Sequence, residues 1–246
     1  MSAQIGHKSG PKNGGADRRL SGISANTIFL ACNFGNRRVK GHFDALKRSW
    51  EANLPVRVYL SDQVAGGGAR DLWQDITLTI KEANLAIFDV TSFRPNVVLE
   101  LGFALANKQA GQIVICRDLT PGGRTSPEQT DWLLSDISHL HRIDYRSFKD
   151  LDKQLLQHVE RMAPVRKFYR LVEEIEHQNI SVAPLYVAEA LGILTALRDT
   201  GPITRRDFRS RLENRGVDAK KLGALLKSVG LAKPAQRKIG VWKLID

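Results

Sequence analysis

The sequence has few cysteines and lacks any long hydrophobic run. Cys32 and Cys116 are the only cysteines, and neither lies in a Cys-x-x-Cys or Cys/His spacing. We therefore expect no disulfide framework, no redox pair and no metal site. No apolar run reaches the roughly 18 residues of a membrane span, and residues 1–25 have no apolar core typical of a signal peptide. These absences predict a cytoplasmic protein that does not enter the membrane.

Acidic residues are in the minority, and the positive excess is unevenly distributed. The net charge is +11, with 37 basic and 26 acidic side chains. Residues 1–25 hold 4 basic and 1 acidic side chain, residues 26–163 hold 17 and 16, and residues 164–246 hold 16 and 9. A basic segment attracts polyanions through counterion release, but a solvated surface has the same composition. Charge therefore indicates where to look and not what is bound.

Three parts follow from composition and periodicity. Residues 1–25 are rich in Gly, Ser and Lys with almost no apolar side chains, which predicts a flexible basic tail. Residues 26–163 alternate short apolar runs with amphipathic stretches, the pattern of an α/β domain. Residues 164–246 show mainly helical periodicity and form, in this interpretation, a helical linker and a second small domain.

The α/β part predicts a five-stranded, largely parallel sheet with helices on both faces, because its strands are almost continuously apolar. The predicted strands are 27–32, 56–60, 85–90, 112–116 and 141–145, and the predicted helices are 39–52, 71–83, 96–106, 130–138 and 148–162. In such a sheet ligands bind beyond the carboxyl ends of the strands. That rule points to Cys32–Phe34, to Ser61 and Asp62, and to Asp89–Thr91.

Four helices and a hairpin are predicted beyond Pro164. The helices are 168–177, 183–198, 205–212 and 217–229, and the hairpin spans 231–245. The order of elements from residue 183 resembles the winged-helix family. A DNA-recognition helix carries basic residues on its outer face and apolar residues on its inner face. The predicted helix 217–229 has this pattern, with Lys220, Lys221 and Lys227 opposite an apolar face. The alternative is docking to a partner protein or a second copy of the chain through Trp242 and Leu244.

The stretch from Asp89 to Ala104 carries the clearest chemical signal. Asp89 ends a buried strand, a proline-containing turn follows, and Asn96 is a good helix N-cap. We expect Glu100 one turn into the helix, on a side that faces neither Val97 nor Leu101. The helix dipole favours an ionised carboxylate there.

Two carboxylates, Asp89 and Glu100, could then project into one cleft. Such a pair suits cleavage of a glycosidic bond, with one group acting at the anomeric carbon and the other on hydroxyls or the leaving base. The structural alternative is that Asp89 caps a turn and Glu100 pairs with an arginine such as Arg94 or Arg37.

The run from Ile76 to Ala106 resembles the nucleoside 2-deoxyribosyltransferase-like family, a flavodoxin-like relative of TIR domains. The residues that carry the resemblance are Asp89, Thr91, Pro95, Asn96, Val97, Glu100, Leu101 and Gly102. The resemblance implies that Glu100 is the nucleophile at C1′ of a sugar. In TIR-type NAD hydrolases a helix glutamate likewise promotes cleavage of the nicotinamide–ribose bond.

The sequence thus favours a hydrolase or transferase acting on an N-glycosidic bond of a nucleotide or nucleoside. NAD is a candidate substrate, no bound cofactor is expected, and a bacterial antiviral defence effector would have this organisation. The alternatives are a non-catalytic nucleotide-sensing regulator that binds DNA or a partner protein, and a scaffold for assembly, such as a homo-oligomer. The predicted catalytic residues are Glu100 and Asp89, and the predicted substrate-binding residues are Asn33, Phe34, Asp62, Thr91 and Asn96.

Overall fold

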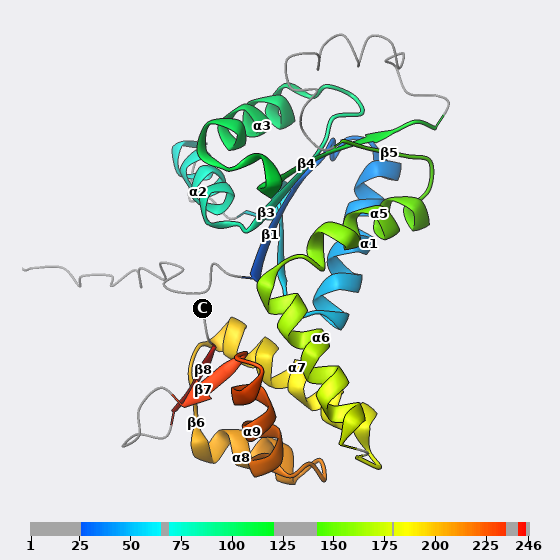
Figure 1. Cartoon of the computed structure of the whole chain (residues 1–246). Coiled ribbons are helices and arrows are strands. Elements are labelled where there is room, and N and C mark those ends of the chain that lie inside the picture. Colours follow the sequence, from blue (N-terminus) through cyan, green and yellow to red (C-terminus); the bar gives the residue numbers. More distant parts are fainter. Residues whose placement is uncertain (1–25, 65–68, 121–141, 179, 235–240, 245–246) are drawn as a thin grey trace, which may run out of the picture.

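The structure is a computed structural model that describes residues 26–64, 69–120, 142–178, 180–234 and 241–244 (Figure 1). The predicted tail (1–25), the glycine loop at 66–68 and the predicted helix at 130–138 lie outside the described residues. None of the described helices is both long and apolar enough to cross a membrane.

A five-stranded parallel sheet forms the upper part of the molecule in Figure 1, as predicted. Its strands are β1 (Thr27–Ala31), β2 (Arg57–Leu60), β3 (Leu85–Asp89), β4 (Ile113–Asp118) and β5 (Arg142–Tyr145). Their order is β2-β1-β3-β4-β5, and every neighbouring pair is parallel. This is the flavodoxin-like order, with β3 in the centre. The strands end within a residue or two of the predicted positions.

Helices cover both faces of this sheet. On one face α1 (Arg37–Asn53) and α5 (Phe148–Val159) pack over Ile28, Leu30 and other strand side chains. On the other, α2 (Ala69–Glu82) and α3 (Pro95–Asn107) cover the alternate positions, such as Phe29 and Phe88. Every residue of β1 and β3 is buried. Burial on both faces explains why these strands read as continuous apolar runs in the sequence.

The helix starts differ from the predictions for local reasons. Helix α1 begins two residues early because the Asn36 side chain accepts hydrogen bonds from the backbone N–H of Arg38 (3.1 Å) and Val39 (3.3 Å). Helix α3 begins at Pro95, with Arg94 in the N-cap position and no side-chain capping bond. The expectation that Asn96 caps this helix is therefore wrong. Proline fits the first helical position, where its missing N–H costs nothing.

The C-terminal part has a separate core. It comprises α6 (Ala163–His177), α7 (Ala183–Thr200), β6 (Ile203–Thr204), α8 (Arg205–Glu213), α9 (Ala219–Ser228), β7 (Ala232–Pro234) and β8 (Val241–Leu244). The three strands form an antiparallel sheet in the order β6-β8-β7. Strand β6 was not predicted, since two residues are too short to show a periodicity. The winged-helix assignment stays a prediction.

Helix α6 joins the two parts. Its Val165 belongs to the core that packs against α1 and α5, whereas Phe168, Leu171 and Ile175 belong to the C-terminal core. At the edge strand β2, a second connection is polar. Arg198 at the end of α7 donates to the carbonyl of Val56.

Candidate active site

A pocket of about 530 Å³ lies beyond the carboxyl ends of β1, β2 and β3. In a sheet of this order, a ligand is expected in the crevice between β1 and β3. At this point the chain has added β2 on one side of β1 and continues with β3 on the other side. The first turns of α3 and the apolar face of α2 complete its wall. It is lined by Cys32, Asn33, Phe34, Gly35, Ser61, Asp62, Leu72, Ile76, Arg94, Pro95, Asn96, Val97 and Glu100.

Glu100 is a buried carboxyl group in the wall of this pocket, with only 4% of its surface exposed. Ser61 Oγ donates a hydrogen bond of 2.6 Å to Glu100 Oε1. Glu100 Oε2 has no hydrogen-bond partner among the described residues. One oxygen is therefore hydrogen-bonded, and the other is buried in the pocket wall without a partner among the described residues.

The face of α3 that carries Glu100 differs from the prediction. The helix buries Val97, Glu100, Leu101 and Ala104 together. At 3.6 residues per turn, positions three, four and seven apart share one face. The expectation that Glu100 points away from Val97 and Leu101 was therefore wrong, and Glu100 is the single acidic member of a buried stripe.

Burial raises the pKa of Glu100 to about 7. The hydrogen bond from Ser61 acts in the opposite direction and lowers the pKa, but it does not outweigh desolvation. The expected gain from the helix dipole does not keep this group fully ionised at neutral pH. Near pH 7 the carboxyl group therefore exists in both protonation states.

No arginine among the described residues forms an ion pair with Glu100. The alternative in which Glu100 pairs with Arg94 or Arg37 is therefore not observed among these residues. Arg94 instead donates from Nε to Asn33 Oδ1, at 2.9 Å. A buried carboxylate without a cation costs stability unless something else uses its charge. This arrangement leaves the negative charge of Glu100 for a bound molecule.

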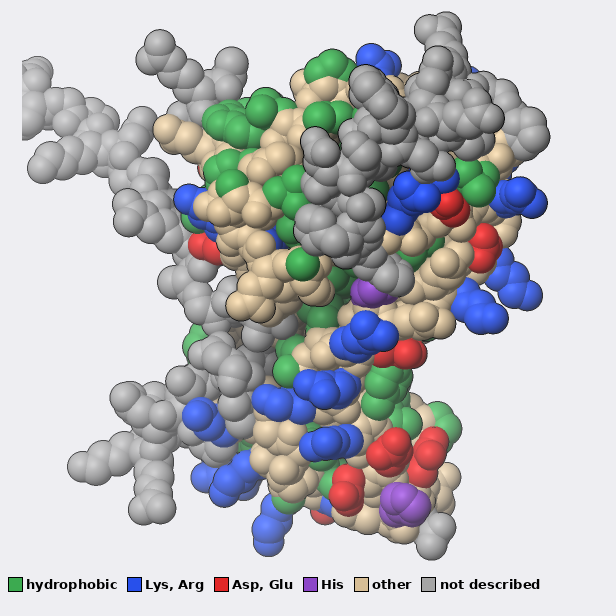
Figure 2. Space-filling view, turned by 45° about the horizontal axis from the view of Figure 1, so that its top comes forward, with side chains coloured by type: hydrophobic (Ala, Val, Ile, Leu, Met, Phe, Trp, Pro, Cys, Tyr) green, Lys and Arg blue, Asp and Glu red, His purple; other side chains and the backbone are tan. Residues whose placement is uncertain are grey.

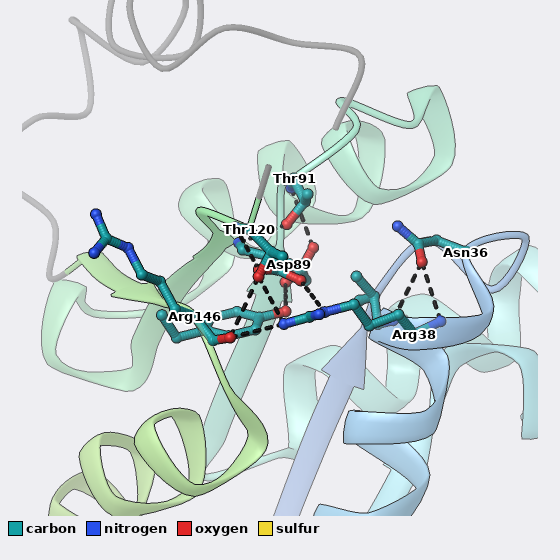
Figure 3. Close-up of polar contacts among 9 residues, drawn as sticks. Asn36, Arg38, Asp89, Thr91, Thr120 and Arg146 are labelled. Carbon is teal, nitrogen blue, oxygen red and sulfur yellow. Dashed lines mark hydrogen bonds and ion pairs between the residues drawn. The ribbon is translucent and has the colours of Figure 1, made fainter. Parts of the chain in front are cut away.

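Asp89 lies at the end of β3 behind the pocket, and is only 2% exposed. Tyr145 donates from its hydroxyl to Asp89 Oδ2 (2.7 Å), and the backbone N–H of Thr91 donates to Oδ1 (3.1 Å). Figure 3 shows Asp89 within a polar cluster that also contains Thr91, Thr120 and Arg38. Burial raises its pKa to about 6, against the lowering effect of the hydrogen bonds from Thr91 and Tyr145.

The expectation that Asp89 lines one pocket with Glu100 is corrected by this geometry. Asp89 is not among the described residues that line the pocket, because its carboxylate points toward Tyr145 and β4 and not toward β2. It caps the turn at Thr91, which was the structural alternative. Thr91 is also buried behind the pocket, and its Oγ1 accepts from the backbone N–H of Asp118 (2.8 Å).

The other predicted substrate-binding residues do line the pocket: Asn33, Phe34, Asp62 and Asn96. Asp62 forms an ion pair with Lys40 (3.3 Å), whose ammonium lies 5.6 Å from the centre of the Phe34 ring. Lys40 also pairs with Asp44 (3.1 Å), so Asp62 shares its cation, whereas Glu100 has none among the described residues.

Two of the polar side chains that line the pocket, those of Ser61 and Arg94, were not predicted as site residues. Ser61 directly follows β2, in the segment that the strand-end rule indicates, but a lone serine gives no chemical signal. Arg94 was considered only as a partner of Glu100. The sequence signal that could have identified it is its position immediately before Pro95, at the start of the helix.

The polar cluster around Asp89 extends to Arg38, beyond the ends of β4 and β5 (Figure 3). Arg38 donates from Nε to Asp118 Oδ2 (2.9 Å) and from Nη2 to Thr120 Oγ1 (2.6 Å) and the Arg146 carbonyl (2.7 Å). The cluster thus ties α1 to the ends of β4 and β5, next to Asp89.

Metal and thiol chemistry find no support in the described part of the chain. It contains no group of three or more His, Cys, Asp or Glu side chains that could hold a metal ion. Cys32 lines the pocket, but burial and the nearby Asp89 raise the pKa of its thiol. A thiol of this kind stays protonated and is a poor nucleophile.

Comparisons with known proteins give limited information. No protein-family model matches this chain, and no curated protein is similar to it at a significant level. The solved structure of a CMP N-glycosidase from Clostridium botulinum, BcmB, is similar with a TM-score of 0.39 and 20% identity. The match covers 53% of this chain and 98% of that one. A similarity of this size does not assign an activity, so the function must be argued from the pocket.

Proposed function

We propose that this protein cleaves an N-glycosidic bond of a nucleotide or nucleoside, with Glu100 acting at the anomeric carbon C1′. The observation that carries the proposal is the unpartnered Oε2 of Glu100, on a buried carboxyl group in the wall of the pocket. The transition state for this reaction develops positive charge on the sugar. A carboxylate that no cation neutralises is the group that stabilises such charge best.

The reaction can be written from the residues of the pocket. Glu100 Oε2, ionised, attacks C1′ while the bond from C1′ to the base nitrogen breaks and its electron pair leaves with the base. Ser61 holds Oε1, so the carboxylate keeps one orientation during the attack. Water, or an N–H group of a second base, then attacks C1′ and loses one proton to solvent. The C1′–O bond to Glu100 breaks at the same time, and its electron pair restores the carboxylate. A base that leaves as an anion takes a proton from water, whereas nicotinamide leaves neutral.

Asp89 has a different role in this proposal from the one predicted. It is a positioning residue, since it fixes the hydroxyl of Tyr145 and the turn at Thr91 below the pocket. Apolar side chains Leu72 and Ile76 and the ring of Phe34 offer a surface for a planar base. NAD is one candidate substrate, because its nicotinamide–ribose bond is of the same chemical class.

The test is release of free base from NAD, nucleosides and nucleotides by the purified full chain, followed by chromatography. Glu100→Gln keeps the shape and removes the charge, so turnover should fall by on the order of a hundredfold or more. Glu173→Gln changes an exposed glutamate on α6 and serves as the matched control. Base release that is equal in the two variants would refute the assignment of Glu100.

A second candidate function is regulation by binding DNA or a partner protein through the C-terminal part, and a specific observation favours DNA. Helix α8 presents Arg205, Arg206 and Arg209 around a pocket of about 430 Å³. These side chains are exposed and have no ion pair among the described residues. Figure 2 shows Lys and Arg side chains gathered over the C-terminal part of the chain. Unpaired cations of this density attract a phosphate backbone.

A further inference from the structure

Arg94 stands at the mouth of the pocket with its guanidinium held in one orientation. Its Nε donates to Asn33 Oδ1 at 2.9 Å, and it has no ion pair among the described residues. The terminal nitrogens of the guanidinium therefore remain available for a ligand. An arginine fork matches two oxygens of a phosphate group, and a fork that is already oriented loses less entropy on binding.

Asn33 is the residue that fixes this orientation. Its Oδ1 accepts from Arg94 Nε and from the backbone N–H of Gly35 (3.1 Å), and its Nδ2 donates to Ser92 Oγ (3.0 Å). Because both ends of the amide are engaged, the acceptor oxygen faces Arg94. The loop after β1 is thereby tied to the loop between β3 and α3.

Gly35 provides the room that the guanidinium occupies. A Cβ atom at this position would lie 3.0 Å from Arg94 Nη2 and 3.2 Å from Asn33 Oδ1. Such distances are tighter than ordinary van der Waals contacts. A side chain on residue 35 would therefore force the Arg94 guanidinium to shift by a few tenths of an ångström.

The backbone before Arg94 is strained. Phe93 has a φ of 44°, and it is the one non-glycine residue with positive φ among the described residues. This conformation costs roughly 1–2 kcal/mol for a residue with a side chain. The ring of Phe93 packs against the core under α2 and α3. The turn thus directs Arg94 to the N-terminus of α3.

The N-terminus of α3 adds donors beside Arg94. No side chain caps this helix, and Asn96 and Val97 both line the pocket. Their N–H groups lie in the first turn, which has no intrahelical acceptors. Donors and dipole at this end favour an anion.

The second carboxylate of the pocket, Asp62, has a cation beside it. Lys40 lies 3.3 Å from Asp62 and also pairs with Asp44 at 3.1 Å. Glu100 lies four residues after Asn96, about 6 Å further along the helix axis. A nucleotide has a comparable separation, because O4′, C4′, C5′ and O5′ link its C1′ to the phosphorus atom. A phosphate at the start of α3 would therefore place C1′ at the level of Glu100 along the helix axis.

We propose that the substrate is a nucleotide with a 5′-phosphate on the sugar whose bond is cleaved, and that Arg94 and the N-terminus of α3 bind that phosphate. This inference rests on the proposed function, because it takes Glu100 as the group that meets C1′. It narrows the substrate class from nucleotides and nucleosides to 5′-phosphorylated nucleotides.

The test compares matched ligand pairs by calorimetry in the Glu100→Gln background, where turnover does not interfere. The pairs are AMP and adenosine, GMP and guanosine, CMP and cytidine, UMP and uridine, and NAD and nicotinamide riboside. For at least one pair the phosphorylated ligand should bind more tightly. Arg94→Gln should weaken that ligand by about 10- to 100-fold and leave its unphosphorylated partner unchanged.

Three further variants sharpen the result. Arg94→Lys keeps the charge but loses the fork, so it should restore only part of the affinity. Gly35→Ala keeps Arg94 but crowds its Nη2, and should weaken the phosphorylated ligand selectively. Arg37→Gln is the matched control, because Arg37 is exposed on the adjacent α1 and does not line the pocket. It should have no effect.

The outcomes separate this inference from the proposed function. If Arg94→Gln weakened the affinity for the phosphorylated and the unphosphorylated ligand equally, Arg94 would have a structural role and the inference would be overturned. Failure of every phosphorylated ligand to bind would overturn it as well. Base release from nucleosides as fast as from nucleotides would overturn it while the proposed function stands. Binding that depends on Arg94, without any base release from the wild-type chain, would refute the proposed function and support the phosphate site.

Discussion

Ser61 Oγ lies 2.6 Å from Glu100 Oε1, and this hydrogen bond joins the end of the edge strand β2 to the buried face of α3. The bond stabilises the charged form of a carboxyl group that burial would otherwise keep protonated. Among the described residues it is therefore the hydrogen bond that raises the ionised fraction of Glu100.

Removal of this bond should shift the pH profile of the reaction. Ser61→Ala raises the pKa of Glu100 further above its present value of about 7, so a smaller fraction is ionised at neutral pH. We expect the acidic limb of the kcat profile to move to higher pH, and the rate at pH 7 to fall about severalfold. Ser181→Ala, at an exposed serine outside the pocket lining, should leave the limb in place. A lower rate without a shift would show that Ser61 acts only on geometry.

Stability should fall as pH rises from about 4 to about 7. The folded pKa of Glu100 is raised to about 7, whereas an unfolded glutamate titrates near 4.3. Between these values the folded state binds more protons than the unfolded state, so increasing pH disfavours folding. Glu100→Gln should raise the free energy of unfolding by about 3–4 kcal/mol at pH 8 and little at pH 4. Urea unfolding at the two pH values measures the difference.

The sequence predicted the layers of the fold better than the direction of its side chains. Continuous apolar runs identify the strands of a sheet buried on both faces, and those strands appear at the predicted residues. Asp89 and Glu100 lie eleven positions apart across a turn, and periodicity does not say on which side of the sheet each points. Tyr145, which draws Asp89 away from the pocket, is 56 positions distant. A hydrogen bond between residues so far apart in the chain leaves no local pattern in the sequence.

Loss of the Tyr145 hydroxyl should destabilise the protein in a pH-dependent way. Tyr145→Phe removes the donor to Asp89 Oδ2 and leaves a buried carboxylate with less support. We expect a loss of about 1–3 kcal/mol at pH 8. The loss should be smaller at pH 5, below the Asp89 pKa of about 6, where the carboxyl group is protonated. Tyr169→Phe, at a half-buried tyrosine that donates to Glu160 (3.3 Å), is the control.

The second candidate function predicts salt-dependent binding of DNA by the C-terminal part. Reversal of charge at Lys220 and Lys221 should lower the affinity about tenfold or more at low salt and flatten its salt dependence. The fold should tolerate the change, because Asp218 caps α9 through backbone N–H groups and acidic residues suit a first helical turn. Lys149→Glu with Lys153→Glu on α5 is the matched control. DNA affinity that is absent at low salt would favour a protein partner. Affinity unchanged by the first pair would leave Arg205, Arg206 and Arg209 of α8 as the DNA contact.

Helix α6 supplies side chains to both hydrophobic cores, and this has a consequence for unfolding. Neither core can lose its packing without exposing apolar surface of the shared helix, so the described parts should melt in a single cooperative transition. A ligand that binds only the folded state raises the midpoint of that transition. Occupancy of the pocket beside β1 would then slow proteolysis at α8 and α9, on the opposite side of the shared helix, without any change in their shape.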